Sequence, residues 1–162
     1  MVNDTLFTAH NREDITATRT FSLLYLQPIL QKVQANNGNI YPQEDLKLQL
    51  LIDLKTPAEE TLKALVALLS PHESIFVPKG PIKVVISGNT PAPENFSQYP
   101  DFIFFDGRPN IAYTNEQLKR IGLISQAFQK YSRWNGEGDL TEKDRKALSK
   151  VIEQTHTLDK KI

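Results

Sequence analysis

Short apolar runs alternate with segments of helical spacing along the chain. Three runs rich in β-branched, leucine and phenylalanine residues, at 48–55, 82–89 and 101–106, each predict a strand. Apolar residues with helical periodicity at 20–35 and 57–69 predict helices between or before them. Strands separated by helices predict an α/β fold with a parallel sheet.

Further elements are expected at both ends. An extended run at 6–10 predicts a short strand ending in His10. The remainder is expected to be mostly helical, at 115–131 and 141–156, with 121–125 as a candidate extended piece.

The predicted strands have two unequal faces. One face of the run at 48–55 is wholly apolar, whereas Asp53 and Lys55 lie on the other, and the run at 82–89 repeats this asymmetry. An apolar face suits a layer of helices, and a mixed face suits a barrel interior. The pattern therefore favours a parallel β/α (TIM-type) barrel over a doubly wound sheet, and no glycine-rich loop indicates nucleotide binding.

Polar side chains gather where the predicted strands end. A β/α barrel builds its active site at this edge, so we expect these side chains to converge. The candidates are His10, Asp53, Lys55, Ser87, Asn89 and Asp106.

Length limits how much of a barrel is present. A closed eight-stranded barrel typically takes about 250 residues, and this chain has 162. We therefore expect one partial barrel domain over 1–162, with the first and last strands absent and the exposed strand edges open to association.

Composition limits the classes of ligand and partner that we expect for this chain. Lys and Arg total 19, as do Asp and Glu, so no excess of positive charge indicates nucleic acid. Without cysteine, a metal would have to bind through oxygen or imidazole ligands. No apolar run is long enough for a transmembrane segment and no signal peptide is evident, and the location stays open.

Several ordered motifs give the chain a family resemblance. It resembles a bacterial and fungal branch of the glycerophosphodiester phosphodiesterase and phosphatidylinositol-specific phospholipase C superfamily. The motifs are Leu6-Phe-Thr-Ala-His10-Asn11, 19–28, Leu50-Leu-Ile-Asp53-Leu-Lys55-Thr56, Val85-Ile-Ser-Gly-Asn89, Phe104-Phe-Asp106-Gly107-Arg108 and Ile124-Ser125.

The resemblance implies a barrel that cleaves phosphodiesters with a divalent cation, Ca²⁺ or Mg²⁺. It implies His10 as the second of two acid/base histidines, Asp53 as a metal ligand and Lys55 as a catalytic cation facing the phosphate. The other histidine and a Glu-x-Asp pair would lie before Met1, so we expect this piece to be inactive alone. Asn11 stands where the wider superfamily often has aspartate.

The residue types fit phosphodiester cleavage, which requires proton transfer and stabilisation of phosphate oxygens. Ser87, Asn89 and Asp106 are expected to bind the substrate, a small phosphodiester or a lipid headgroup. The sequence leaves open which phosphodiester is cleaved, and whether by water or by internal cyclisation.

Each candidate also has a structural explanation. Asp53 and Lys55 could form an ion pair at a strand end, and His10 could be a hydrogen-bonded loop histidine. Ser87 and Asn89 suit a turn, and Asp106 suits a loop cap. A noncatalytic α/β binding or structural protein is therefore the alternative function.

Overall fold

A computed structural model describes residues 5–162. Four parallel strands form one sheet in the order β1 (Leu48–Leu54), β2 (Ile82–Gly88), β3 (Ile103–Gly107) and β4 (Ile121–Ile124). The predicted α/β fold with a parallel sheet is confirmed. The sheet is open, so the barrel expected from the sequence is not present as a closed structure among the described residues.

The helices follow the predicted alternation for most of the chain. A π-helical segment, Ser22–Leu26, continues into α1 (Gln27–Ala35). The remaining helices are α2 (Ala58–Leu69), α3 (Asn115–Lys119) and α4 (Glu142–Thr157). Short 3₁₀ turns lie at Arg12–Asp14, Ser70–Ile75, Pro93–Gln98 and Phe128–Lys130.

Helix α2 begins as its local sequence requires. Pro57 occupies the N-cap position, where its missing N–H costs nothing, and Glu59 and Glu60 place negative charge at the helix N-terminus. The Thr61 hydroxyl donates to the Pro57 carbonyl at 2.7 Å and lies 2.6 Å from the Thr56 hydroxyl. These bonds fix the turn that directly follows β1.

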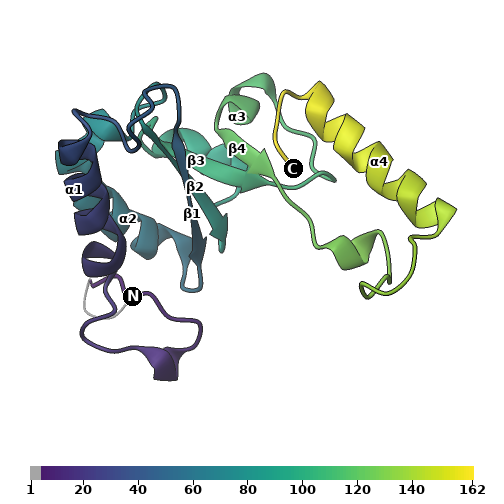
Figure 1. The fold of residues 1–162 in the computed structure, drawn as a ribbon, viewed down its shortest axis with the longest axis horizontal. Coiled ribbons are helices and arrows are strands. Elements are labelled where there is room, and N and C mark those ends of the chain that lie inside the picture. Colours follow the sequence, from purple (N-terminus) through teal and green to yellow (C-terminus); the bar gives the residue numbers. More distant parts are fainter. Residues whose placement is uncertain (1–4) are drawn as a thin grey trace.

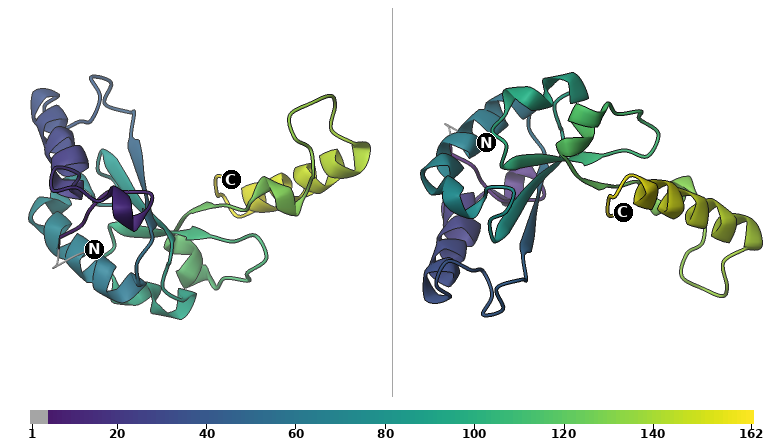
Figure 2. Two further views of the ribbon diagram at one scale, coloured as in Figure 1. Left: turned by 90° about the horizontal axis from the view of Figure 1, so that it is seen from below. Right: turned by 90° about the horizontal axis from the view of Figure 1, so that it is seen from above.

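The core lies on one face of the sheet. Leu54, Val84 and Phe105 from three strands pack in a single buried cluster with Leu62 and Leu65 of α2. Helices α1 and α2 cover this face (Figures 1 and 2). The apolar face predicted from strand alternation is therefore confirmed.

The opposite face of the sheet is mixed and only partly covered. Leu51 is 52% exposed there. The Lys83 ammonium lies 4.6 Å from the centre of the Phe104 ring and donates to the Gly122 carbonyl at 3.4 Å. Burial, with Lys160 and Lys161 nearby, lowers the pKa of Lys83.

Two predictions of local structure are wrong. Residues 6–8 pair antiparallel with residues 19–21 and do not join the sheet, because their backbone groups bond Arg19 and Phe21 instead. The helix expected over 115–131 ends at Lys119. The candidate extended piece at 121–125 is confirmed, because Ile121–Ile124 form β4, in which Ile121 and Ile124 are almost fully buried in the sheet core.

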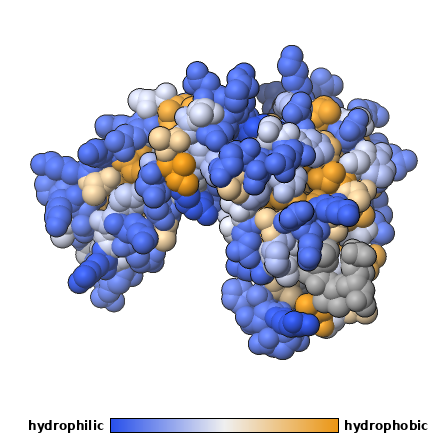
Figure 3. Space-filling model, turned by 180° about the vertical axis from the view of Figure 1, so that it is seen from behind, coloured by the Kyte–Doolittle hydropathy of each residue, from blue (hydrophilic) through white to orange (hydrophobic). Residues whose placement is uncertain are grey.

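Residues 126–158, called here the C-terminal arm, lead away from the sheet. Figure 3 shows an open notch between this arm and the body of the molecule. The chain then returns to the sheet, where the Ile124 amide donates to the Lys161 carbonyl at 2.9 Å. No helix within residues 5–162 has the length and apolarity needed to cross a membrane.

Candidate functional site

Polar side chains meet at the carboxyl edge of the sheet. Asp53 near the end of β1 lies opposite Ser87 of β2 in the parallel register. The next strand contributes Asp106, whose carboxylate accepts a 2.6 Å hydrogen bond from the Ser87 hydroxyl. The edge therefore carries a continuous row of polar groups across three strands, as predicted from the polar residues at the strand ends.

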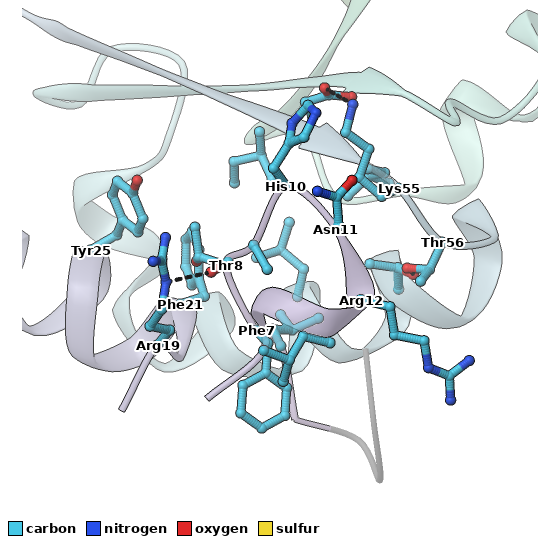
Figure 4. A pocket seen from close by; sticks show the side chains of 18 of the residues that line it. Phe7, Thr8, His10, Asn11, Arg12, Arg19, Phe21, Tyr25, Lys55 and Thr56 are labelled. Atoms are coloured by element: carbon cyan, nitrogen blue, oxygen red, sulfur yellow. Dashed lines mark hydrogen bonds and ion pairs between the residues drawn. The ribbon is translucent and has the colours of Figure 1, made fainter. Parts of the chain in front are cut away.

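His10, Asp53 and Lys55 line one pocket of about 800 Å³. Such a volume can hold a small-molecule ligand. Figure 4 shows the side chains of His10, Asn11 and Lys55, which all line this pocket. The structure thus brings together three residues that come from two distant parts of the sequence.

The Lys55 ammonium lies 2.6 Å from the Asp53 carboxylate, and the two side chains are 56% and 51% exposed. An ion pair this exposed contributes only about 0–1 kcal/mol to stability, because solvent screens it. Breaking this ion pair so that either group can bind a ligand therefore costs little free energy.

The position of His10 is set by bonds on both sides of it. The Thr8 amide donates to the Arg19 carbonyl at 2.8 Å, and the Arg19 Nε returns a bond to the Thr8 carbonyl at 3.2 Å (Figure 4). After His10, the Asn11 amide donates to the Asp14 carboxylate at 3.1 Å. The histidine therefore sits between two hydrogen-bonded turns of an irregular segment.

A second cluster surrounds Asp106, whose side chain is 2% exposed. Its Oδ2 accepts hydrogen bonds from Ser87 Oγ at 2.6 Å and Ser125 Oγ at 2.7 Å, and pairs with Arg108 Nη1 at 2.7 Å. Its Oδ1 is buried without a partner among residues 5–162. The carboxylate is thus enclosed by the protein's own donors.

Tyr113, in the loop after β3, also contacts this cluster. Its hydroxyl oxygen accepts a 2.8 Å bond from the Arg108 amide. Burial raises the pKa of Tyr113, so its hydroxyl stays protonated over the neutral range.

Asn89 bonds to the segment around the end of β1 and not to the Asp106 cluster. Its amide donates to the Leu54 carbonyl at 3.0 Å, and its side chain donates to the Thr56 carbonyl at 3.3 Å. Asn89 therefore ties the end of β2 to the turn after β1, while Ser87 and Asp106 bond directly to each other.

The described residues do not form a complete cation site. No group of three or more His, Asp or Glu side chains within residues 5–162 could hold a metal ion. Asp53 offers an exposed carboxylate in the pocket, but Ca²⁺ and Mg²⁺ take six or more ligands, and water alone seldom supplies the rest.

Arg108 and Ser125, which contact the Asp106 carboxylate directly, were not among the predicted site residues. Arg108 follows β3 and Ser125 follows β4. Both could have been found by the rule that identified the others, because polar residues after strand ends share one edge of a parallel sheet. Ser125 lies at the end of the candidate extended piece at 121–125, which forms β4, but it was not chosen as a site residue.

Comparison with known proteins identifies a distant relative. No family model matches the chain, and no solved structure gives a significant match. The chain is similar to a protein of Arthroderma benhamiae named altered inheritance of mitochondria protein 6 homolog. The two are 27% identical, and the alignment covers 66% of this chain and 41% of the relative. The chain therefore corresponds to less than half the length of that relative.

Proposed function

We propose that this chain contributes the phosphate-facing part of a metal-dependent phosphoric diester hydrolase, of the glycerophosphodiester phosphodiesterase or phospholipase C type. One observation carries the proposal: His10, Asp53 and Lys55 line a single pocket at the carboxyl edge of a parallel sheet. A proton-transfer group, a carboxylate and a cation are the groups that phosphodiester cleavage requires.

Each residue has a role in this proposal. Lys55 stabilises negative charge on a non-bridging phosphate oxygen, because its ammonium is exposed in the pocket and held near the strand end by Asp53. His10 transfers a proton to or from the reacting oxygen, since an imidazole ring can both donate and accept a proton. Its exposure leaves the ring accessible to a ligand.

A divalent cation, when bound, would neutralise charge on the phosphate. Asp53 is the ligand that this chain would supply, and the other ligands would come from outside residues 5–162. The roles proposed for His10 and Lys55 follow from their own positions in the pocket and do not depend on how the cation is bound.

We also propose that the open sheet is a segment of a parallel β/α barrel. Sequential strand order with the helices on one face supports this arrangement. The opposite face carries Lys83, Val85 and Ser87, and Val85 is fully buried there, apart from the helix-side core. The chain's coverage of 41% of its relative leaves room for further strands in a longer protein.

The proposal is tested by assaying a chromogenic phosphodiester with the full protein that contains this chain. We expect cleavage that a chelator abolishes, and a loss of about 100-fold or more in kcat for His10→Ala. Lys55→Ala should lower kcat/KM by a similar factor. His72→Ala, a histidine outside the pocket, serves as the matched control and should retain full activity.

Absence of cleavage by the full protein, or cleavage unaffected by His10→Ala, would refute the proposal. The Asp53–Lys55 pair would then be structural, as in a noncatalytic α/β binding protein. Thermal melting of each variant ensures that lost activity does not reflect unfolding.

A further inference from the structure

The Arg108 guanidinium is held from one side only. Its Nη1 donates to Ser125 Oγ at 2.9 Å and to the Gly107 carbonyl at 3.0 Å, and it lies 2.7 Å from Asp106 Oδ2. Two hydrogen bonds and one ion pair at the same nitrogen hold the guanidinium in one orientation. Asp106 is itself held by Ser87, so the support extends into the sheet.

The other edge of the guanidinium is free. Nε and Nη2 of Arg108 donate to no acceptor within residues 5–162, and the side chain is 35% exposed. These two nitrogens form the side-on fork that binds two oxygens of a phosphate or carboxylate in parallel. An arginine whose orientation is already fixed loses less conformational entropy when it binds such an anion.

The fork lies on the same edge as the His10 pocket. Asp53 faces Ser87 across the β1–β2 register, and Ser87 bonds to Asp106, the partner of Arg108. Neighbouring strands are about 4.8 Å apart, so the ends of β1 and β3 are separated by roughly 10 Å. One phosphate-bearing molecule can span that separation.

Neither oxygen of Asp106 is exposed to a ligand. Oδ2 accepts hydrogen bonds from Ser87 and Ser125 and pairs with Arg108, and Oδ1 is buried, although it has no partner among residues 5–162. A negative carboxylate would also repel a phosphate, whereas its paired guanidinium would attract one. The chemistry of this cluster therefore favours an anionic ligand contacted through arginine.

We infer that Arg108 is an anion-binding residue of this edge, contacting a phosphate group through Nε and Nη2, and that Asp106 and Ser125 are positioning residues that orient it. Asp106 then acts through Arg108 and does not bind the substrate directly. The inference rests on the proposed function for the identity of the anion as a phosphoryl group.

Direct binding of inorganic phosphate to the full protein tests the inference without requiring turnover. Calorimetry or phosphorus NMR should give a dissociation constant on the order of 1 mM for the unchanged protein. Arg108→Ala should weaken binding about tenfold or more, because two charge-assisted hydrogen bonds are lost. Arg108→Lys should weaken it severalfold, since the charge remains but the fork is removed.

Ser125→Ala tests the positioning role. It leaves all charges in place and removes one contact that orients the guanidinium, so phosphate binding should weaken by about threefold. Arg133→Ala is the matched control, because Arg133 is exposed on the C-terminal arm and should leave binding unchanged. Melting temperatures identify any variant that fails to fold.

The outcomes separate this inference from the proposed function. If phosphate fails to bind the unchanged protein, or binds Arg108→Ala and Arg108→Lys as tightly as the unchanged protein, the inference is wrong even where phosphodiester cleavage is observed. If phosphate binding depends on Arg108 while no phosphodiester is cleaved, Arg108 remains an anion-binding residue and the hydrolase proposal fails.

Discussion

At the residue scale, Gly88 determines how closely the ends of β1 and β2 approach. Its φ of +74° lies in the left-handed region that favours glycine. A Cβ at this position would collide with the Asp53 carboxylate and the Leu54 carbonyl, and would lie 2.9 Å from the Leu54 amide nitrogen. The glycine therefore leaves room for the Asp53 side chain, which lines the pocket.

Gly88→Ala should destabilise the fold by about 2–4 kcal/mol, because the backbone strain adds to a clash with another strand. Urea unfolding measures the change. Gly138→Ala is the control, since Gly138 has a similar φ of +63° but a methyl group there would meet nothing within 4 Å. We expect about 1 kcal/mol for the control, and equal losses for both variants would show that the contact with β1 is unimportant.

The candidate site was predictable to different degrees at this scale. Ser87 and Asp106 were expected at one edge because parallel strands end together, and they bond directly. The enclosure of Asp106 was not predictable, because it depends on Ser125 after β4 and Arg108 after β3 contacting the same oxygen. Sequence spacing cannot show which oxygen of a carboxylate is occupied.

At the element scale, α4 differs from the other helices. It lies away from the sheet in Figures 1 and 2, and its buried Val151 is not part of the main core cluster. Its start is fixed locally, because the Thr141 hydroxyl accepts a 3.1 Å bond from the Asp144 amide. The helix expected at 141–156 is thus confirmed, although it contributes no residue to the main core cluster.

Hydrogen exchange should reflect this difference. Amides of α4 should exchange at least about tenfold faster than those of β2, because opening the helix exposes little of the main core. Mass spectrometry of deuterium uptake in the two segments provides the comparison. Equal protection would mean that the C-terminal arm unfolds only together with the sheet.

At the scale of the whole molecule, β1 is an unpaired edge strand of an open sheet among the residues that the structure describes. Leu51 lies exposed on its uncovered face, next to backbone groups that can pair with another chain. The surface therefore combines the two features that promote association between sheets.

Self-association should increase with concentration and should fall in Leu51→Lys, because the charge opposes pairing along the edge and face. Light scattering over a concentration series measures it. Leu46→Lys changes a similarly exposed leucine just before β1 and should have a smaller effect. A monodisperse monomer at all concentrations would contradict the expectation.

The sequence by itself determined the first three strands, their apolar faces, helix α2 and the edge at which polar residues gather. These features follow from local periodicity, capping and the alternation of side chains, which need no distant contact. Only the tertiary structure decided that residues 6–8 pair with 19–21, that the extended piece at 121–125 joins the sheet beside β3 and that Arg108 contacts Asp106. Each depends on how the chain packs in three dimensions, whose free energy outweighs local preference.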